Sequence, residues 1–341
     1  MKTNWNEVWA MFDQIPGGVR TVSFLLTFAG SIAAGFAVIP LLKKLRAGQP
    51  VREDGPATHL AKSGIPTMGG LIFIIPAALV LAALSAWDHR ILPSLLVTLG
   101  FGLVGFADDL LKVRRRNKDG LTPARKTIGV IFFASLFSVY TAFSANVGTS
   151  ILLPLTGLSG ELALPFWLYI PLTVFVMYAT ANAVNLTDGV DGLAPTVTML
   201  VMAAFTLAAA ISVREDGAAA LTAAFAGGCL GFLFFNAHPA RVIMGDCGSL
   251  ALGGAVSAAA VMMRMHWILV FFGVIYVAEA LSVVIQVSSF KRTGRRVFKM
   301  APIHHHFELS NWSENRVVAV FSAVTLASCC IGLLLLFWRV F

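Results

Sequence analysis

Charged residues are scarce in this sequence of 341 residues, of which Asp, Glu, Lys and Arg make up only 12%. A soluble domain usually carries about twice that share, so the composition excludes a disordered, fibrous or nucleic-acid-binding chain. Cysteine is also rare. The four cysteines have no spacing typical of zinc ligands or of a disulfide framework.

Hydrophobic residues, in contrast, make up 57% of the chain and gather in long runs. A membrane-spanning helix needs about 20 mostly apolar residues, so the runs predict a single all-α transmembrane domain over residues 1–341 with ten spans. The third and eighth are the shortest. The expected spans are Val19–Leu42, Gly69–Trp87, Ile91–Ala107, Thr127–Ala145, Leu162–Ala181, Leu193–Val213, Ala218–Phe235, Ser249–Met263, Trp267–Ser289 and Val317–Val340.

The basic residues predict how these helices are oriented. In chain order, the first, third, fifth, seventh and ninth connections hold five, seven, none, one and six of them, so 19 of the 25 lie on one side. Loops rich in Lys and Arg tend to stay in the cytoplasm, which predicts that both termini lie outside. The net charge of +8 also points to an anionic lipid surface or an anionic substrate. The alternative is that each basic cluster only sets the orientation of the helices in the membrane. The connection at residues 146–165, with its prolines and glycines, is expected to form a small hairpin outside.

Aspartate and asparagine gather at the cytoplasmic ends of the spans. The fifth connection has no cation and places a polar residue at every third position, at Asn182, Asn185, Asp188 and Asp191. On a helix, neighbours in such a series share a face. Amides recognise the polar edges of a ligand, and carboxylates bind its hydroxyl or N–H groups or a metal. The alternative is an Asx-rich turn that caps two helices.

Asp108 and Asp109 end the third span. Adjacent residues on a helix point about 100° apart, which predicts that the pair does not share one ligand geometry. One would face a reacting group as a general base, while the other orients it or faces cations. The alternative is that the two aspartates lie at the membrane interface and form ion pairs with Lys112 and Arg114 to Arg116.

Asp246 lies among glycines at the start of the eighth span. It is expected to be either the N-cap of that helix or a magnesium ligand. Magnesium binds through one or two carboxylates and substrate phosphates and keeps several waters. The neighbouring Cys247 does not argue for zinc, since no further soft ligands accompany it.

Three consecutive histidines, His304, His305 and His306, lie in the last cytoplasmic connection. They cannot all bind one metal from a helix, but one or two can contact a phosphate. The alternative is a solvated polar loop.

Two weaker signals remain. The glycine-rich turn before the second span contains Thr67, with Lys62 close by, and resembles a phosphate-contacting turn. Glu279 and Gln286, seven residues apart on the ninth span, are expected to link helices rather than to take part in catalysis.

Two classes of function fit these observations. One is an enzyme that acts at the cytoplasmic face on a phosphorylated substrate with magnesium. The other is a transporter or channel, which would place its ionisable residues near mid-membrane on discontinuous helices. The polar groups here gather at one interface, which favours the enzyme.

Four motifs closely resemble those of the phospho-N-acetylmuramoyl-pentapeptide transferases, a family of polyprenyl-phosphate N-acetylhexosamine-1-phosphate transferases. They occur in order over nearly the whole chain, and the histidine motif points to the peptidoglycan member. The motifs are Asp108-Asp109, Asn182-x-x-Asn185-x-x-Asp188-x-x-Asp191-Gly192, Gly245-Asp246-x-Gly248-Ser249 and Met300-Ala-Pro-Ile-His304-His305-His306-Phe-Glu308.

The resemblance implies that UDP-N-acetylmuramoyl-pentapeptide donates its phospho-sugar to undecaprenyl phosphate, giving lipid I and UMP. It also implies magnesium as the cofactor, the bacterial inner (cytoplasmic) membrane as the location, ten transmembrane helices with both termini outside, and a homodimer. The physical logic agrees, because an isoprenoid cannot leave the bilayer and a nucleotide sugar cannot enter it. Their phosphates can meet only at the interface.

By the same resemblance, Asp246 would hold magnesium on the diphosphate. Asp108 would be the base on the lipid phosphate, or the nucleophile of a two-step scheme, and Asp109 would support it. The residues expected to line the uridine-diphosphate pocket are Lys62, Thr67, Asn182, Asn185, Asp188, Asp191 and Asn236. Those expected to contact phosphate or sugar are Lys126, His304, His305 and His306.

One position departs from the family pattern. Some members stack the uracil on an aromatic residue three positions before the metal-binding Asp, where this chain has Ile243. The alternatives to the peptidoglycan enzyme are a related transferase that uses UDP-N-acetylglucosamine and, in a different class, a transporter.

Overall fold

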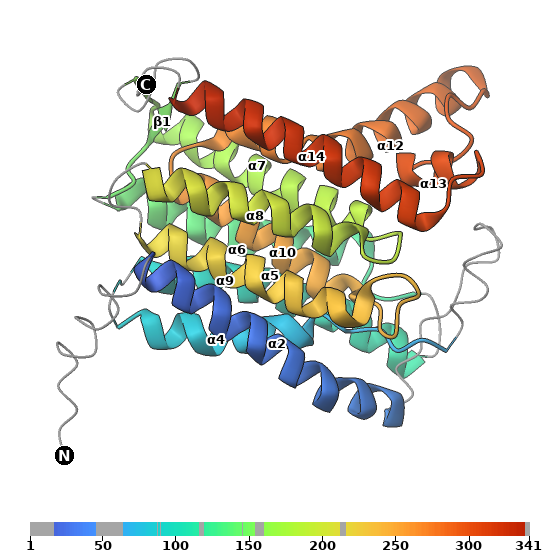
Figure 1. The fold of residues 1–341 in the computed structure, drawn as a ribbon. Coiled ribbons are helices and arrows are strands. Elements are labelled where there is room, and N and C mark those ends of the chain that lie inside the picture. Colours follow the sequence, from blue (N-terminus) through green and yellow to red (C-terminus); the bar gives the residue numbers. More distant parts are fainter. Residues whose placement is uncertain are drawn as a thin grey trace.

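The computed structural model describes residues 17–45, 64–86, 88, 90–115, 119–144, 146–153, 160–211 and 216–337. Lys62 lies outside these ranges. The described chain is an elongated bundle of helices that run roughly side by side (Figure 1). Its long helices are α2 Gly18–Lys44, α4 Leu71–Leu84, α5 Ile91–Arg115, α6 Pro123–Phe143, α7 Phe166–Thr187, α8 Leu193–Ile211, α9 Asp216–Asn236, α10 Gly245–Met262, α12 Val274–Thr293 and α14 Glu314–Phe337. The short elements are β1 Ser150–Leu152, β2 Glu161–Ala163, η2 His266–Ile268, α11 Leu269–Phe272 and α13 Ile303–Glu308.

A helix occupies each of the ten expected spans, but their lengths differ from expectation. Among the described residues, nine helices are long and apolar enough to cross a membrane. The second expected span is the exception, because α4 has 14 residues, about 21 Å of helix against a hydrocarbon core of about 30 Å. The third span, expected to be short, is α5 with 25 residues, since the helix continues past its aspartates to Arg115.

The two ends of the bundle differ in character. At one end lies the predicted hairpin, in which Ser150 of β1 is paired with Ala163 of antiparallel β2. Helix α2 begins and helix α14 ends at this same end, and α13 lies at the opposite end (Figure 1). The aspartate-bearing ends of α5, α7 and α10 also lie opposite the hairpin. The predicted gathering of acids at one end of the spans is therefore confirmed, whereas the side of the membrane that this end faces stays a prediction.

Helix α10 forms the centre of the bundle. Every residue from Cys247 to Met262 is buried, and most of these residues are Ala, Gly or Ser, which let neighbouring helices approach closely. Gly253 packs against Ala181 of α7, and Gly254 packs against the ring of Phe101 of α5. Large apolar side chains cover much of the outer surface instead, as expected of a surface that meets lipid.

Candidate active site

Three carboxylates from two helices converge at the end of the bundle opposite the hairpin. Asp108 and Asp109 lie near the C-terminal end of α5, and Asp246 lies in the first turn of α10. One oxygen atom of each lies within 4.8 Å of the others. We call these three residues the acid cluster. The prediction that Asp108 and Asp109 do not share one ligand geometry is therefore wrong. The 100° between their Cα–Cβ directions does not fix the carboxylate positions, because each side chain still turns about two bonds.

Glycines make this convergence possible. A Cβ atom on Gly105 of α5 would collide with the carbonyl group of Asp246, and one on Gly70 would collide with the main chain of Gly248. The main chains of α5 and of the segment before α4 therefore touch the start of α10 directly. A side chain at either position would push the helices apart and open the acid cluster.

The segment before α4 is held to α10 by main-chain hydrogen bonds. The N–H of Ile243 donates to Pro66 O at 2.8 Å, while the N–H groups of Gly69 and Gly70 donate to Ile243 O and Met244 O at 2.9 Å. This extended pairing explains why α4 begins only at Leu71. It also places Thr67 beside the acid cluster, because Thr67 Oγ1 and Asp109 Oδ2 both lie within 3 Å of where a Cβ atom on Gly245 would be.

Two lysines neutralise the acid cluster. The Nζ atom of Lys112, on α5, lies 2.6 Å from Asp108 Oδ2, 2.7 Å from Asp246 Oδ2 and 3.9 Å from Asp109 Oδ1. The Nζ atom of Lys126, on α6, lies 3.0 Å from Asp246 Oδ2. Lys126 was predicted as a site residue, whereas Lys112 was expected only in the alternative interpretation, as an interfacial partner of Asp108 and Asp109. Its spacing of four and three residues from the two aspartates was the signal that could have identified it.

The acidic side chains are also fixed by hydrogen bonds. Asp109 Oδ2 accepts a bond from the N–H of Cys247 at 2.9 Å, and Asp108 Oδ1 accepts one from the N–H of Leu121 at 2.6 Å. Both aspartates are almost completely buried, while Asp246 and the lysines keep part of their surface open. The open side of the cluster is therefore where Asp246 meets Lys112 and Lys126.

Of the polar series at the end of α7, Asn185 joins the acid cluster. Its Nδ2 donates to Asp246 Oδ1 at 2.8 Å and to Ser249 Oγ at 2.7 Å, and its Oδ1 accepts from Lys126 Nζ at 3.4 Å. Ser249 was not predicted as a site residue. The Nδ2 of Asn182, the neighbour of Asn185 in the series, instead donates to the carbonyl of Tyr178 in its own helix at 2.8 Å, so the two amides make different contacts.

Asp191 and Asn236 lie in a separate network that fastens two turns together. Asp191 Oδ2 accepts a hydrogen bond from Ala240 N–H at 3.0 Å and lies 3.3 Å from His238 Nδ1. Asn236 Oδ1 accepts from Gly192 N–H at 3.0 Å, and its Nδ2 donates to Val242 O at 2.9 Å. Both residues thus hold the turn after α7 against the turn after α9, and their contact with a ligand stays a prediction.

Two further residues of this network, His238 and Glu314, were not predicted. Glu314 Oε2 accepts a hydrogen bond from Asp191 N–H at 3.1 Å and lies 3.7 Å from His238 Nδ1. Asp188 lies in the turn between these contacts and α7, where its N–H donates to Asn185 O at 3.3 Å. No sequence spacing connects His238 with Glu314, because they come from distant parts of the chain.

The three histidines point to three different partners. His304 Nδ1 lies 3.0 Å from Glu279 Oε1 of α12, and its Nε2 faces Gly189 in the turn after α7. His305 Nδ1 lies 2.8 Å from Glu308 Oε2, and His306 Nδ1 accepts a hydrogen bond from Lys299 N–H at 3.1 Å. Within the described part of the chain, His304 Nε2 has no hydrogen-bond partner although it is buried. The histidine loop, which we define as residues 294–308 including the short helix α13, therefore closes over the Asp188–Gly192 turn.

Glu279 and Gln286 hold this loop in place. Besides the contact of Glu279 with His304, Gln286 Oε1 accepts from Val297 N–H at 3.0 Å and from Phe298 N–H at 2.9 Å. The prediction of a linking role is confirmed, because Glu279 connects α12 to the short helix α13 and Gln286 connects α12 to the chain before α13.

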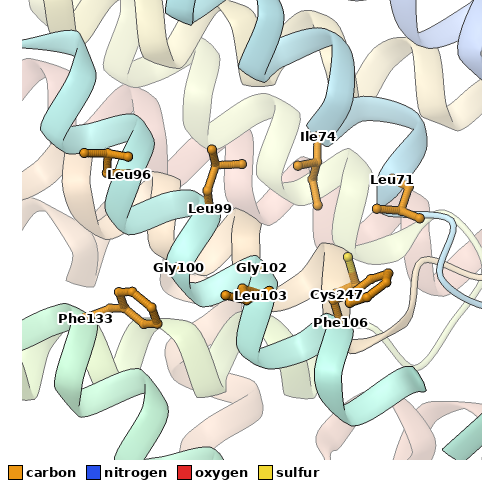
Figure 2. Close-up of a pocket in the computed structure, with 10 residues that line it drawn as sticks. All are labelled: Leu71, Ile74, Leu96, Leu99, Gly100, Gly102, Leu103, Phe106, Phe133 and Cys247. Carbon is orange, nitrogen blue, oxygen red and sulfur yellow. The ribbon is translucent and has the colours of Figure 1, made fainter. Parts of the chain in front are cut away.

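An apolar pocket of about 400 Å³ adjoins the acid cluster. Figure 2 shows its side chains along α5, with Leu96 at one end of the row and Phe106 and Cys247 at the other. Because Cys247 also donates its N–H to Asp109, the pocket and the acid cluster share a wall. Its lining residues are Leu71, Ile74, Leu96, Leu99, Gly100, Gly102, Leu103, Phe106, Phe133 and Cys247.

The donor set of the acid cluster fits a hard divalent cation. Magnesium prefers carboxylate oxygens and water, and here three carboxylates lie close enough to approach one ion. Asp246 does not serve as an N-cap, because the cap position of α10 is Met244 and no side-chain cap bond is formed there. Asp108, Asp109 and Asp246 are therefore the residues that could hold the metal.

Comparison with known proteins gives a consistent result. The profile of glycosyl transferase family 4 matches residues 91–264, and phospho-N-acetylmuramoyl-pentapeptide-transferase signature 1 matches residues 62–74. A phospho-N-acetylmuramoyl-pentapeptide-transferase of Acetivibrio thermocellus is 52% identical over 91% of this chain and 93% of its own length. Proteins with the same name from Desulforamulus reducens and Clostridium kluyveri are 47% and 46% identical, over 92% of this chain and 93% and 98% of their own lengths.

Proposed function

Since the chain belongs to the phospho-N-acetylmuramoyl-pentapeptide-transferase family, we propose that it transfers phospho-N-acetylmuramoyl-pentapeptide from UDP-N-acetylmuramoyl-pentapeptide to undecaprenyl phosphate. The products are lipid I and UMP. The observation that carries the proposal is the acid cluster with its two lysines at one end of a membrane bundle. A site of this kind suits the handling of phosphates at an interface.

The apolar pocket supports a lipid acceptor. One end of the pocket reaches Cys247 beside the acid cluster, while most of its other lining residues belong to α5, with Leu71 and Ile74 from α4 and Phe133 from α6. An amphiphile could therefore bring its phosphate to the lysines while its hydrocarbon chain stays among leucine and phenylalanine side chains. Burial of each methylene group would contribute about 0.8 kcal/mol.

We propose that Asp108, Asp109 and Asp246 hold magnesium. The ion would neutralise the two anionic substrates as they approach each other. Asn185 and Ser249 orient Asp246 through the hydrogen bonds described above, and Cys247 N–H orients Asp109. Lys126 then remains beside Asp246 as a cation for a phosphate oxygen.

Asp108 is the proposed general base. An oxygen atom of the lipid phosphate attacks the phosphorus atom that bears the sugar, and the bond from that phosphorus to the oxygen of UMP breaks. Asp108 accepts the proton of the lipid phosphate at Oδ1, the oxygen that Leu121 N–H holds in position, while Oδ2 is the oxygen that faces the cation. A lipid phosphate is a competent nucleophile once it is positioned, which favours this direct transfer over a covalent intermediate on Asp108.

The distribution of basic residues supports the placement of this site. We propose that the acid cluster faces the cytoplasm, that both termini lie on the other side of the bacterial cytoplasmic membrane, and that two chains form a homodimer. The first two proposals rest on the 19 of 25 basic residues that lie in the odd-numbered connections between the expected spans. The homodimer rests on the family resemblance.

A substrate comparison tests the function. Purified protein is given undecaprenyl phosphate and magnesium with either UDP-N-acetylmuramoyl-pentapeptide or UDP-N-acetylglucosamine, and UMP release is measured. We expect UMP and lipid I only from the muramoyl substrate. Preferred turnover of UDP-N-acetylglucosamine would instead identify the related transferase, and no UMP from either would contradict a transferase. The Asp246→Asn variant, purified in parallel, controls for contaminating activity.

A further inference from the structure

The Lys112 side chain occupies an unusual position in the acid cluster. Its Nζ atom bridges two carboxylates from different helices, at 2.6 Å from Asp108 Oδ2 and 2.7 Å from Asp246 Oδ2, and lies 3.9 Å from Asp109 Oδ1. Among the described lysines and arginines, Lys112 is the one whose charged group lies near all three carboxylates. Lys126 pairs with Asp246 and with neither of the other two. The ammonium group therefore sits between the carboxylates rather than at their edge.

A divalent cation bound to the same carboxylates would need nearly the same space. Magnesium lies about 2.0–2.1 Å from its oxygen ligands, so an ion bridging Asp108 and Asp246 would fall where Lys112 Nζ now is. Two cations cannot occupy that space, because their repulsion at such a distance is strong wherever water is largely excluded. Metal binding and the present position of Lys112 thus exclude each other.

We propose that the Lys112 ammonium is a built-in substitute for the divalent cation, which holds the acid cluster together in the metal-free protein and is displaced when the metal binds. The inference rests on the proposed metal site of the transferase. Without a cation between them, the two almost completely buried aspartates would repel each other and Asp246. A lysine suits this exchange, because its long, flexible stem can carry the charge a considerable distance.

The displaced side chain has an open direction to move in. Lys112 is 28% exposed, whereas Asp108 and Asp109 are 4% and 3% exposed. The open side of the cluster is also the side from which a phosphate would approach. Lys112 is therefore a positioning residue. Its ammonium group moves toward the substrate only after the metal has taken its place, so metal binding prepares the site to bind an anion.

Binding of Mn²⁺ to the full-length protein, followed by electron paramagnetic resonance without substrate, tests the exchange. The Lys112→Met variant keeps the apolar stem but removes the competing charge, so it should bind Mn²⁺ at least about tenfold more tightly than the wild type. Its metal-free form should melt at a lower temperature, and Mn²⁺ should raise that temperature more than it does in the wild type. Arg115→Met is the matched control. It removes one positive charge from the exposed last turn of the same helix, and its Mn²⁺ affinity should equal that of the wild type.

A second measurement needs no substitution. Wild-type protein is treated with a water-soluble, amine-reactive acylating reagent with and without Mn²⁺, and the labelled lysines are quantified by mass spectrometry. Labelling of Lys112 should rise when Mn²⁺ is bound, relative to the exposed Lys291 on α12, because displacement frees its Nζ atom.

The outcomes separate this inference from the proposed function. Equal or weaker Mn²⁺ binding by Lys112→Met, or Lys112 labelling that Mn²⁺ leaves unchanged or lowers, would overturn the exchange while leaving the transferase proposal intact. A wild-type protein that binds no Mn²⁺ and still forms lipid I in excess chelator would overturn the metal site and the exchange together.

Discussion

The Nδ1 atom of His304 lies 3.0 Å from Oε1 of Glu279, and their side chains are only 1% and 0% exposed. The contact joins the histidine loop to α12 in a place that water does not reach. Removing one partner therefore leaves the other without its hydrogen bond in a buried setting.

Glu279→Ala should destabilise the protein by about 1–3 kcal/mol, the cost of an unsatisfied buried polar group, and should raise KM for the UDP-sugar by loosening the histidine loop. Glu161→Ala is the control, since it removes an exposed ion pair with Arg264 at 2.7 Å, worth at most about 1 kcal/mol. Thermal unfolding followed by size-exclusion chromatography measures both variants. Equal losses would contradict the buried role of Glu279.

Asp246→Asn should lower turnover by orders of magnitude. The substitution keeps the shape and the hydrogen bond from Asn185 but removes a hard anionic ligand and the charge that Lys126 faces. UMP release by the wild type should likewise stop in excess chelator and return when magnesium is restored. Full activity of the wild type in chelator would exclude the metal site.

Release of UMP without lipid distinguishes the two mechanisms. Direct transfer predicts no UMP when wild-type enzyme receives the UDP-sugar and magnesium alone. With lipid present, Asp108→Asn should slow turnover by about 10²–10⁴-fold, the usual contribution of a general base, while nucleotide binding survives. A burst of one UMP per site without lipid, abolished by Asp108→Asn, would show that Asp108 is a nucleophile.

The orientation of the bundle can be tested with single cysteines in a background where the exposed Cys330 is replaced by serine. Cysteine at Arg295, beyond α12, should react with a membrane-impermeant reagent only from the cytoplasmic side. Cysteine at Leu162 of the β hairpin, which is exposed, should react only from the outside. Labelling of the Leu162 position from the cytoplasm would invert the proposed topology.

Leu103→Trp should interfere with the lipid acceptor. Leu103 lines the apolar pocket and is 60% exposed, so a larger side chain can fill the pocket without disturbing the helix. We expect KM for undecaprenyl phosphate to rise several-fold with KM for the UDP-sugar unchanged. Leu136→Trp, at an exposed position of α6 outside the pocket, is the control. An unchanged lipid KM in Leu103→Trp would show that the chain binds elsewhere.

The sequence was sufficient to predict the helices, because long apolar runs and loop composition are local signals. It located ten helices, the hairpin and the end of the bundle where acids gather. It did not predict that α4 is short. That depends on hydrogen bonds between Gly69 or Gly70 and the main chain before Asp246, a pairing between distant segments that no local pattern reveals.

The sequence predicted which residues make up the candidate site better than it predicted how they are arranged. Asp108, Asp109, Asp246, Asn185 and Lys126 lie together, although the two neighbouring aspartates were expected to point apart. Asn182 does not join them, because a regular spacing does not prevent an amide from bonding to its own helix. Lys112 was expected as a partner of the two aspartates but not as a site residue, since a lysine after a span serves topology as well as chemistry, and only the approach of α10 shows which role applies.

The ends of the described chain have a practical consequence. Helix α2 begins and helix α14 ends at the hairpin end of the bundle, away from the acid cluster (Figure 1). A reporter domain joined beyond either helix would leave the entry of a nucleotide sugar unobstructed. Such a reporter would also have to mature on the far side of the bilayer from the carboxylates. This requirement limits the fluorescent or enzymatic tags that can be used to follow the protein in living cells.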